Sequence, residues 1–324
     1  MGTRVLEYSL EPIMQFPAVW RRSAATFAAA TALILSGASA PAFAAQQPVK
    51  YVNLGDSYSA GWGSFAPTAV GNPVYLSPEY GGPTCLHGGP DDVTLFDQLR
   101  SVAPTGDYAC AGALVGDPNS TAGVPAGGIP TIVQQAAEAS RDGALNSTTG
   151  LVTLTAGGND VNFGQIIGAC AADPSPTAVG CQEAVAYGVQ LANGVDVAGT
   201  VATIRGYAAN AKIAWLGYPQ LFATAGESTT VIAGGGVMSA AAAAVFDKGT
   251  DQLNAVLAGR ARSAGAQFVD VTPKFNGHEI GSSDSWFNLG QYTQFNFHPT
   301  ADGYTQGYYP AMVSAIKPAQ LVKG

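Results

Sequence analysis

Four positions in this sequence have the residue types that acyl transfer requires: a nucleophile, a base that accepts its proton, and hydrogen-bond donors for the developing oxyanion. Ser57 can supply the hydroxyl nucleophile, and its own N–H is a donor. Gly112 offers a second backbone N–H with no side chain to block approach. The side-chain amide of Asn159 offers a third donor, and His298 is the favoured base.

The choice of base is narrow because the sequence contains only three histidines. His87 lies in a Gly/Pro-rich loop, and His278 precedes Glu279. His298 is followed by Pro299, and a proline just before a helix fixes the backbone there. A single histidine is more often structural than catalytic, so rigid presentation is the property that favours His298.

Strands are expected to position three of these residues at the same edge of a sheet. Ser57 follows a β-favourable run over 49–54, Gly112 follows a further strand, and Asn159 follows an expected buried strand over 150–155. Loops beyond the carboxyl ends of parallel strands meet in one crevice. Taken singly, a serine after a strand is usually a helix cap, and Asn-Asp after Gly-Gly is usually a turn.

Strand and helix patterns alternate along the rest of the chain, which predicts βαβ units and a mainly parallel sheet. Further strands are expected over 211–216 and 266–271. Helices are expected over 91–103, 130–139, 184–206, 238–262 and from residue 300 or 301 toward 316. No internal repeat or break in composition indicates a second domain, so we expect residues 45–324 to form a single domain.

The first 44 residues are typical of a secretory signal peptide. Two consecutive arginines precede an apolar stretch over 24–35, and residues 42–44 form a small-x-small cleavage site. We therefore expect cleavage after Ala44, a secreted extracellular protein, and no stable membrane insertion afterwards. Met14 is a more natural start than the first residue, which would leave 1–13 untranslated. The alternative is an uncleaved membrane anchor, although an Ala-rich stretch interrupted by Ser, Gly and Pro is a poor bilayer span.

Four cysteines follow this segment, and an even number in an exported chain indicates disulfides. Of the three possible pairings we favour Cys85–Cys110 and Cys170–Cys181, since each closes a loop within a Gly/Pro-rich region. Free buried thiols are the alternative. No C-x-x-C pair or zinc-ligand spacing occurs, so we expect no metal and no cofactor.

The charge balance argues against two classes of partner. There are 14 Lys and Arg against 22 Asp and Glu, a formal charge of −8, and no block of like charges. Binding to nucleic acid or docking on anionic lipid is therefore not expected. With 47% hydrophobic and 11% charged residues, the chain is not of disordered composition. The expected partner is a small-molecule or lipid ester, and we expect a monomer.

The motifs around these residues resemble those of the SGNH, or GDSL, family of serine hydrolases, particularly its secreted bacterial lipases and esterases. The four matching blocks, in the family's order, are Gly55-Asp56-Ser57-Tyr58-Ser59, Ala109-Cys110-Ala111-Gly112-Ala113, Thr155-Ala156-Gly157-Gly158-Asn159-Asp160 and Phe297-His298-Pro299-Thr300. Shorter matches are Leu216-Gly217-Tyr218-Pro219 and Phe275-Asn276-Gly277-His278. Four ordered blocks are far more specific than any one of them.

This resemblance implies an α/β fold with three layers, α/β/α, around a flavodoxin-like parallel sheet. It also implies a nucleophilic role for Ser57. The N–H groups of Ser57 and Gly112 and the side chain of Asn159 would form the oxyanion hole. His298 would act first as general base and then as the acid that protonates the leaving alcohol.

The sequence departs from the family pattern three residues before the histidine, where many members have an aspartate and this chain has Phe295. Some secreted members of the family orient the histidine through a backbone carbonyl instead. The resemblance implies the same here, from the segment Tyr292–Asn296, which would make the site a Ser–His dyad. Asp284 and Asp302 are less favoured third members.

These observations predict a secreted carboxylic ester hydrolase, an esterase or lipase. Within the same chemistry, the alternatives are an acetylesterase acting on polysaccharide and a phospholipase. A different class of alternative is an exported binding protein that kept the fold and lost catalysis. No G-x-S-x-G occurs, so the nucleophile elbow of α/β-hydrolases is absent. Aromatic residues in the loops that favour an apolar acyl group are Trp62, Phe65, Tyr75, Tyr80, Trp286, Phe287 and Tyr292.

Overall fold

The computed structural model describes residues 46–64, 75–76, 85–117, 119, 128–173, 175–223, 230–232, 236–290 and 293–322. All of them fall within one compact unit, Ala44–Gly324. The expected signal peptide, with its start at Met14 and its cleavage site, lies outside the described residues. In the part that the structure describes, no helix is long and apolar enough to cross a membrane.

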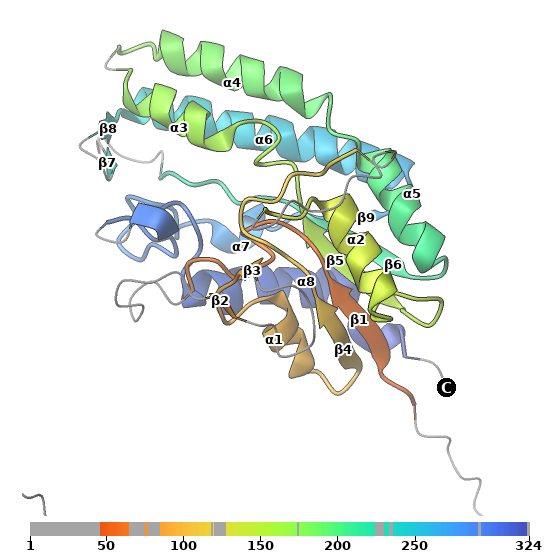
Figure 1. Cartoon of the computed structure of the whole chain (residues 1–324). Helices are drawn as coiled ribbons and strands as arrows, with labels where there is room; N and C mark the ends of the chain where they lie inside the picture. Colours follow the sequence, from red (N-terminus) through yellow and green to blue (C-terminus); the bar gives the residue numbers. More distant parts are fainter. Residues whose placement is uncertain are drawn as a thin grey trace, which may run out of the picture. The chain divides into compact units, whose positions relative to one another are not determined.

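A sheet of five parallel strands forms the centre of the fold (Figure 1). Its strands are β1 (Val49–Asn53), β4 (Val102–Asp107), β5 (Leu151–Thr155), β6 (Lys212–Leu216) and β9 (Gln267–Val269). Their order across the sheet is β4-β1-β5-β6-β9. Counted along the chain this is 2-1-3-4-5, the flavodoxin-like order, which places the topological switch point at the carboxyl ends of β1 and β5. Every residue of β5 is buried, as expected of a central strand covered on both faces.

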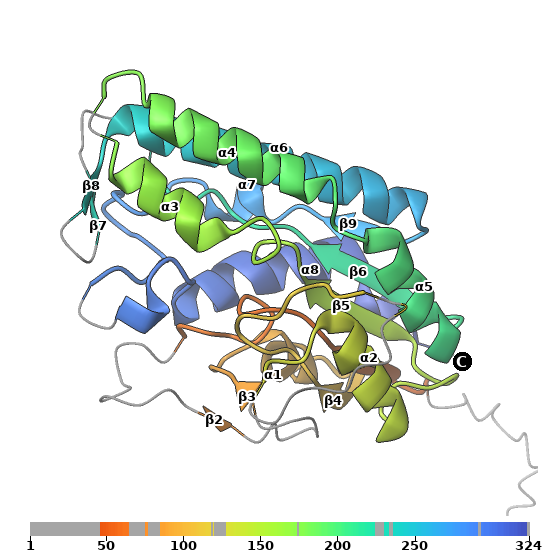
Figure 2. The same cartoon turned by 45° about the horizontal axis from the view of Figure 1, so that its top comes forward.

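Helices cover both faces of this sheet, so the predicted three-layer α/β/α fold is confirmed (Figures 1 and 2). One face carries α1 (Asp92–Asp97) and α8 (Tyr309–Ile316). The other carries α2 (Ile132–Arg141), α5 (Val197–Tyr207) and α6 (Ala240–Ser263), and α3 (Phe163–Ala171) and α4 (Val179–Ala192) pack on α6. The short elements are α7 (Thr272–Phe275), the hairpins β2 (Tyr75–Leu76) with β3 (Cys85–Leu86) and β7 (Thr230–Ile232) with β8 (Gly236–Met238), the 3-10 turns Thr293–Phe295 and Pro318–Gln320, and the π-helical segment Gly303–Tyr308.

Local sequence signals explain where two of these helices begin. Asp91 accepts a hydrogen bond from the N–H of Thr94, whose side chain accepts one in return, so α1 starts with a capping box. Thr131 and Gln134 form the same motif at the start of α2. Buried aromatic side chains then fill the core between the layers, the largest being Trp215, Tyr51, Tyr108, Tyr304 and Tyr308.

The expected strands and helices are found, although the short strands β2, β3, β7 and β8 and the short helix α7 were not predicted and three longer segments differ. The helix predicted over 91–103 ends at Asp97, because the chain turns over 98–101 and enters β4. The helix predicted over 184–206 is two helices, separated by a turn that contains Gly194. Helix α3 was not predicted, since Gly164 and Gly168 lower its helix propensity and no side chain caps its start.

Candidate active site

Ser57 lies four residues beyond the end of β1, in a turn that the side chain of Gln135 holds in place. Gln135 accepts a hydrogen bond from the N–H of Gly55 at 2.8 Å and donates one to the carbonyl of Gly55 at 2.9 Å. Gly55 has φ +136°, and a Cβ there would lie 2.6 Å from the Cβ of Ser59, so only glycine fits. The turn therefore fixes the position of Ser57, which is 8% exposed.

The imidazole of His298 contacts the Ser57 hydroxyl, although the two residues are 241 positions apart. His298 Nε2 lies 2.8 Å from Ser57 Oγ. On the other side of the ring, Nδ1 lies 2.9 Å from the carbonyl oxygen of Asn296. Because a carbonyl only accepts hydrogen bonds, the proton of the neutral ring is on Nδ1 and the Nε2 lone pair faces the serine.

The two aspartates considered as third members do not contact His298. Asp284 lies next to His278, with 3.1 Å between Asp284 Oδ2 and His278 Nδ1. Asp302 accepts a hydrogen bond from Gln306 at 2.9 Å. Asn296, by contrast, belongs to the segment from which a carbonyl was expected.

The backbone around His298 is held by Asn288, a residue that the sequence reasoning did not single out. The N–H of Asn288 donates to the carbonyl of His298 at 2.9 Å, and its side-chain amide donates to the carbonyl of Gly63 at 2.9 Å. Phe297 adopts φ +66°, which is rare for an aromatic residue, and its carbonyl accepts a hydrogen bond from the Tyr58 hydroxyl at 2.6 Å. The imidazole is thus presented by a rigid loop.

Burial sets the protonation state of His298. The side chain is partly buried, and Tyr58 packs against the ring with 5.3 Å between ring centroids. Removal of water disfavours the imidazolium and lowers the pKa of His298 to about 4, although the hydrogen bond to the Asn296 carbonyl acts in the opposite direction. The imidazole is therefore neutral, and able to accept a proton, at neutral pH.

Gly112 and Asn159 belong to two turns that are tied to each other and to the Ser57 turn. The Asn159 side-chain amide donates to the carbonyl of Ala113 at 2.9 Å, and the N–H of Cys110 donates to the carbonyl of Gly55 at 3.0 Å. Gly112 has φ +88°. Among hydrogen bonds between described residues, the N–H groups of Ser57 and Gly112 are not used. These groups, with the second N–H of Asn159, are available as donors to a ligand.

A buried network that the sequence reasoning did not assign connects the Ser57 turn to the Asn159 turn. Asp56 accepts hydrogen bonds from the Tyr218 hydroxyl at 2.5 Å and from the Thr155 hydroxyl at 2.6 Å. The Tyr218 oxygen accepts one in turn from the N–H of Gly158 at 3.0 Å. Burial raises the pKa of Asp56, while these hydrogen bonds act to lower it. The only signal for this network was that Asp56 and Tyr218 both fell in family-like blocks.

Ser57, Asn159 and His298 line one pocket, and an apolar pocket adjoins it. The first is also lined by Asp56, Tyr58, Gly158, Phe163, Tyr218, Pro219, Leu221, Thr250 and Leu253. The second lies between α3, α4 and α6 and is lined by Val161, Phe163, Ile166, Val185, Gly188, Val189, Phe246, Gly249, Thr250 and Leu253. Phe163, Thr250 and Leu253 line both, so the two pockets share part of their walls.

The three expected aromatic residues whose side chains are described do not line the pocket. Trp62 packs against Phe295, and Trp286 stacks on His278 with 3.5 Å between ring centroids. Neither these side chains nor Phe287 are among the pocket-lining residues named above; Phe65, Tyr80 and Tyr292 lie outside the described residues, as does the Tyr75 side chain. Aromatic composition alone does not indicate which face a side chain occupies.

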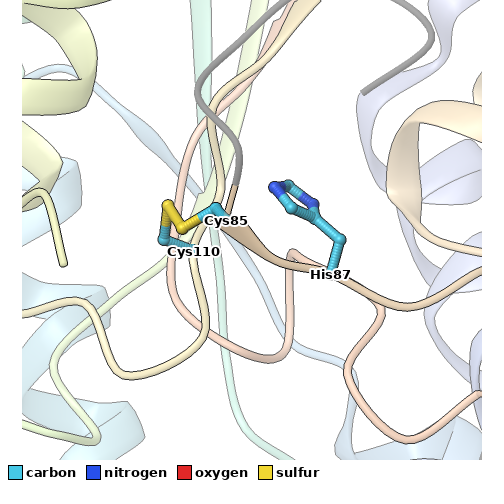
Figure 3. Close-up of side chains that lie close together, drawn as sticks. All are labelled: Cys85, His87 and Cys110. Carbon is cyan, nitrogen blue, oxygen red and sulfur yellow. A yellow bond between two sulfur atoms is a disulfide. The ribbon is translucent and has the colours of Figure 1, made fainter. Parts of the chain in front are cut away.

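Both favoured disulfides are present, Cys85–Cys110 and Cys170–Cys181. Cys85, His87 and Cys110 lie close together (Figure 3). The bond between the two sulfur atoms leaves neither cysteine as a thiolate, so this group does not offer sulfur ligands to a metal. A second group, made of His87, Asp91 and Asp107, is considered below.

Similarity to known proteins agrees with this geometry. A profile of the GDSL-like lipase/acylhydrolase family matches residues 54–306. Lipase 1 of Streptomyces coelicolor is 31% identical over 89% of this chain and 94% of its own length. A lipase of Streptomyces rimosus is 29% identical over 88% of this chain and 93% of its own.

Two solved structures are similar as well. A phospholipase A1 from Streptomyces albidoflavus has a TM-score of 0.64 and 26% identity, covering 83% of this chain and 100% of the other. An extracellular lipase from Streptomyces rimosus has a TM-score of 0.61 and 26% identity, covering 82% of this chain and 99% of the other. The matched range spans all four motif blocks and most of the chain, so this protein belongs to the GDSL-like lipase/acylhydrolase family and is a carboxylic ester hydrolase.

Proposed function

We propose that this protein is a secreted serine esterase or lipase that cleaves esters of apolar carboxylic acids through a dyad of Ser57 and His298. The observation that carries the proposal is the 2.8 Å contact between His298 Nε2 and Ser57 Oγ, made in the pocket that Asn159 also lines. An exported binding protein with no catalytic role would have no reason to keep this contact.

In the proposed reaction, Ser57 Oγ attacks the ester carbonyl while His298 Nε2 takes its proton. The carbonyl oxygen becomes an oxyanion, which accepts hydrogen bonds from the N–H groups of Ser57 and Gly112 and from the Asn159 amide. His298 then returns the proton to the leaving alkoxide, and an acyl-enzyme remains. Water then attacks the carbonyl carbon of the acyl-enzyme while His298 takes one of its protons. His298 returns that proton to Ser57 Oγ as the bond between this oxygen and the acyl carbon breaks, and the carboxylic acid departs.

A backbone carbonyl serves in this mechanism where other serine hydrolases use a carboxylate. The Asn296 carbonyl holds the Nδ1 proton, which keeps Nε2 directed at the serine and provides a dipole for the imidazolium. The fixed loop around Asn288 and Phe297 supplies the orientation that an aspartate would otherwise give. Phe295 at the aspartate position is therefore compatible with catalysis.

A covalent probe tests this proposal directly. A fluorophosphonate is expected to label the folded wild-type chain, with the added mass on the peptide that contains Ser57, because only an activated serine reacts with it. The Ser57→Ala variant is expected to remain unlabelled. Failure of the folded wild type to react would favour the binding-protein alternative.

The apolar pocket favours substrates with an extended acyl chain over acetyl esters. Gly249, on α6, lines it, and a Cβ at this position would lie 2.6 Å from Val185 Cγ1. We expect Gly249→Val to lower kcat/KM for p-nitrophenyl palmitate roughly 50-fold, since excluding about three methylenes costs about 2.4 kcal/mol. The acetyl ester is expected to be cleaved at the wild-type rate.

A matched control for this variant lies on the same helix. At Gly259 a Cβ would have no heavy atom within 4 Å, so Gly259→Val makes the same change of residue outside the pocket. It should leave chain-length preference unchanged. Equal losses on long and short esters in Gly249→Val would indicate a general defect and would contradict an acyl site between α3, α4 and α6.

The pH dependence is expected to reflect the burial of His298. Below a pH of about 4 the imidazole is protonated and cannot accept the Ser57 proton, and above it the base is available. kcat/KM should therefore rise through an apparent pKa of about 4 and then stay level toward neutral pH. Stopped-flow measurement, with circular dichroism at each pH to verify folding, checks this. A midpoint at the ordinary histidine value of about 6.5 would contradict it.

A phospholipase activity is the second candidate, favoured by the similarity to the Streptomyces albidoflavus phospholipase A1. Comparison of kcat/KM for a dipalmitoyl phosphatidylcholine and a palmitoyl monoester of the same chain length distinguishes a phospholipase from an esterase or lipase. Secretion is supported by the two disulfides and by the pattern of the first 44 residues.

A further inference from the structure

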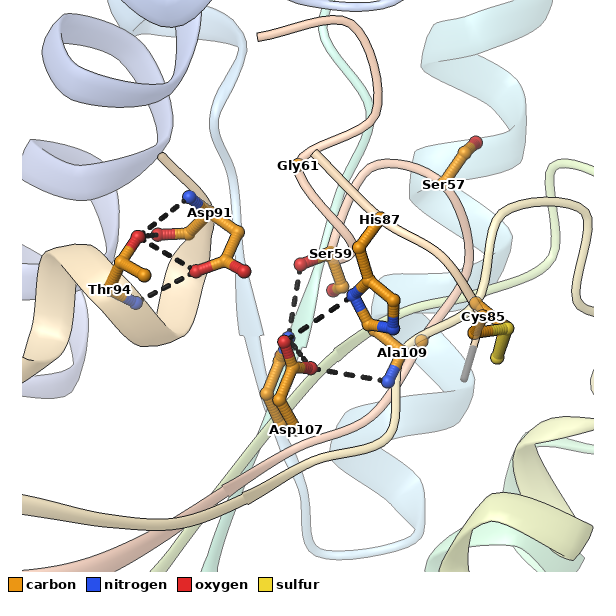
Figure 4. A network of polar contacts seen from close by, with 12 residues as sticks. Ser57, Ser59, Gly61, Cys85, His87, Asp91, Thr94, Asp107 and Ala109 are labelled. Carbon is orange, nitrogen blue, oxygen red and sulfur yellow. Dashed lines mark hydrogen bonds and ion pairs between the residues drawn. A yellow bond between two sulfur atoms is a disulfide. The ribbon is translucent and has the colours of Figure 1, made fainter. Parts of the chain in front are cut away.

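A second buried group of polar side chains lies behind the Ser57 turn (Figure 4). His87 follows β3, Asp91 is the N-cap of α1, and Asp107 ends β4. These side chains are 2%, 5% and 3% exposed, respectively. None of them lines the pocket at Ser57, and the Ser57 hydroxyl points away from them. The group is therefore separate from the proposed catalytic machinery.

The group is incompletely satisfied. Within the described residues, neither ring nitrogen of His87 has a hydrogen-bond partner, although the ring points at Asp107. The neighbouring Asp92 carboxylate is fully buried as well, next to the Ser59 side chain. In that same part of the chain, no lysine or arginine pairs with Asp91, Asp92 or Asp107. Buried carboxylates and an unpaired buried imidazole are costly unless something neutralises them.

The three side chains lie close enough together to surround a small cation, and one separation matches that between two ligands. One ligand atom from each of the three side chains lies within 4.8 Å of the other two. His87 Nδ1 and Asp107 Oδ2 are 3.5 Å apart. Ligand bonds of about 2.1 Å in a tetrahedral site put neighbouring ligand atoms about 3.4 Å apart. The observed separation is thus too long for a hydrogen bond and close to the edge of such a tetrahedron.

Surrounding groups hold one oxygen of each carboxylate, and a hydrogen bond also joins the Asp91 and Asp107 side chains. Asp91 Oδ1 accepts hydrogen bonds from the N–H of Thr94 at 2.8 Å and from its hydroxyl at 2.9 Å. Asp107 Oδ1 accepts from the Asn53 amide at 3.0 Å and from the N–H of Ala109 at 3.3 Å. Metal-binding carboxylates are commonly oriented by second-shell hydrogen bonds of this kind.

We propose that His87, Asp91 and Asp107 bind one divalent transition-metal ion, with Zn²⁺ the best match. An imidazole nitrogen with two carboxylate oxygens suits zinc, whereas calcium and magnesium prefer sites made only of oxygen ligands. The ion neutralises the buried carboxylates and joins the segment after β3 to α1 and β4. Its role is structural, because the ligands do not touch the pocket.

The competing account is that protons rather than a cation neutralise the group. Burial raises the pKa of Asp91 and of Asp107 to about 7, and each of these carboxyl groups also affects the pKa of the other. A carboxyl group whose pKa is raised on folding stabilises the fold at low pH, and that contribution is lost as the pH rises toward its folded pKa. The two accounts therefore differ in metal content and in the effect of pH.

Metal content of the natively purified full chain is the primary test, because a buried site is filled during folding. The protein is expressed in medium containing ZnSO₄, washed with EDTA, and analysed by inductively coupled plasma mass spectrometry. We expect about one zinc per chain, and at least about tenfold less in His87→Gln and Asp107→Asn. Growth with Co²⁺ should give the visible absorption of tetrahedral cobalt in the wild type, which reports the site without any variant.

Two control variants exclude other histidine sites. His278→Gln removes a surface His–Asp pair, and His298→Ala removes the imidazole at Ser57; both should retain the zinc. Wild-type protein that carries no zinc or cobalt would overturn the proposal, as would zinc retained equally by His87→Gln. If the wild type carries no ion and its Tm rises as the pH is lowered from about 8 to about 6, shared protons are the correct account.

Discussion

The His298→Ala variant is expected to lose about as much kcat as Ser57→Ala, on the order of 10⁴–10⁶-fold with p-nitrophenyl butanoate. The reason is the geometry of the pair: Ser57 Oγ has one base, His298 Nε2, at 2.8 Å. A serine hydroxyl without a base is a weak nucleophile. Because the two residues act as a unit, the kcat of the double variant should be no lower than that of either single variant.

His278 provides a matched control, because the same change from histidine to alanine can be made there. His278 also has an imidazole next to an aspartate, with 3.1 Å between its Nδ1 and Asp284 Oδ2, yet it stacks on Trp286 and does not line the pocket. His278→Ala is expected to keep kcat within a few-fold of the wild type. Near-normal turnover in His298→Ala, with its Tm unchanged, would exclude this imidazole as the base.

The fold and the members of the site were predictable where local signals and topology agree. The β5 run consists of aliphatic and β-branched residues and is followed by Asn159, so a buried parallel strand and a polar residue beyond its carboxyl end follow from the same segment. Parallel strands then bring Ser57 and Asn159 to one crevice. His298 required an additional argument, the proline that follows it, because no strand precedes it directly.

The supporting contacts were not predictable, because they join residues whose individual patterns are ordinary. Tyr218 and Asp56 are 162 positions apart, and nothing in the sequence indicates their hydrogen bond. A carbonyl from 292–296 was expected to hold His298, but Asn296 could not be singled out within that segment, because a carbonyl has no residue type to recognise. The proposed zinc ligands, His87, Asp91 and Asp107, come from separate elements and therefore have no diagnostic spacing.

Asn159→Ala is expected to lower kcat by about 10²–10³-fold, or about 3–4 kcal/mol of transition-state stabilisation, with KM nearly unchanged. Asn159 lines the pocket with Ser57, and its Nδ2 is held by the carbonyl of Ala113 at 2.9 Å. That contact uses one N–H and fixes the plane of the amide, so the second N–H is a preorganised donor. An oxyanion needs this donor more than the ground-state ester does, so the loss should appear in kcat.

Two further variants distinguish loss of the hydrogen-bond donor at Asn159 from a general structural defect. Asn159→Asp preserves size but replaces the donor with an anion, and it should be at least as inactive as Asn159→Ala. Asn193→Ala removes an exposed asparagine at the C-cap of α4, whose amide donates to the carbonyl of Val189, and its kcat should equal the wild-type value. If Asn159→Ala instead raised KM and left kcat intact, Asn159 would bind substrate and transition state equally, and the oxyanion hole would have to be formed by the backbone N–H groups of Ser57 and Gly112 alone.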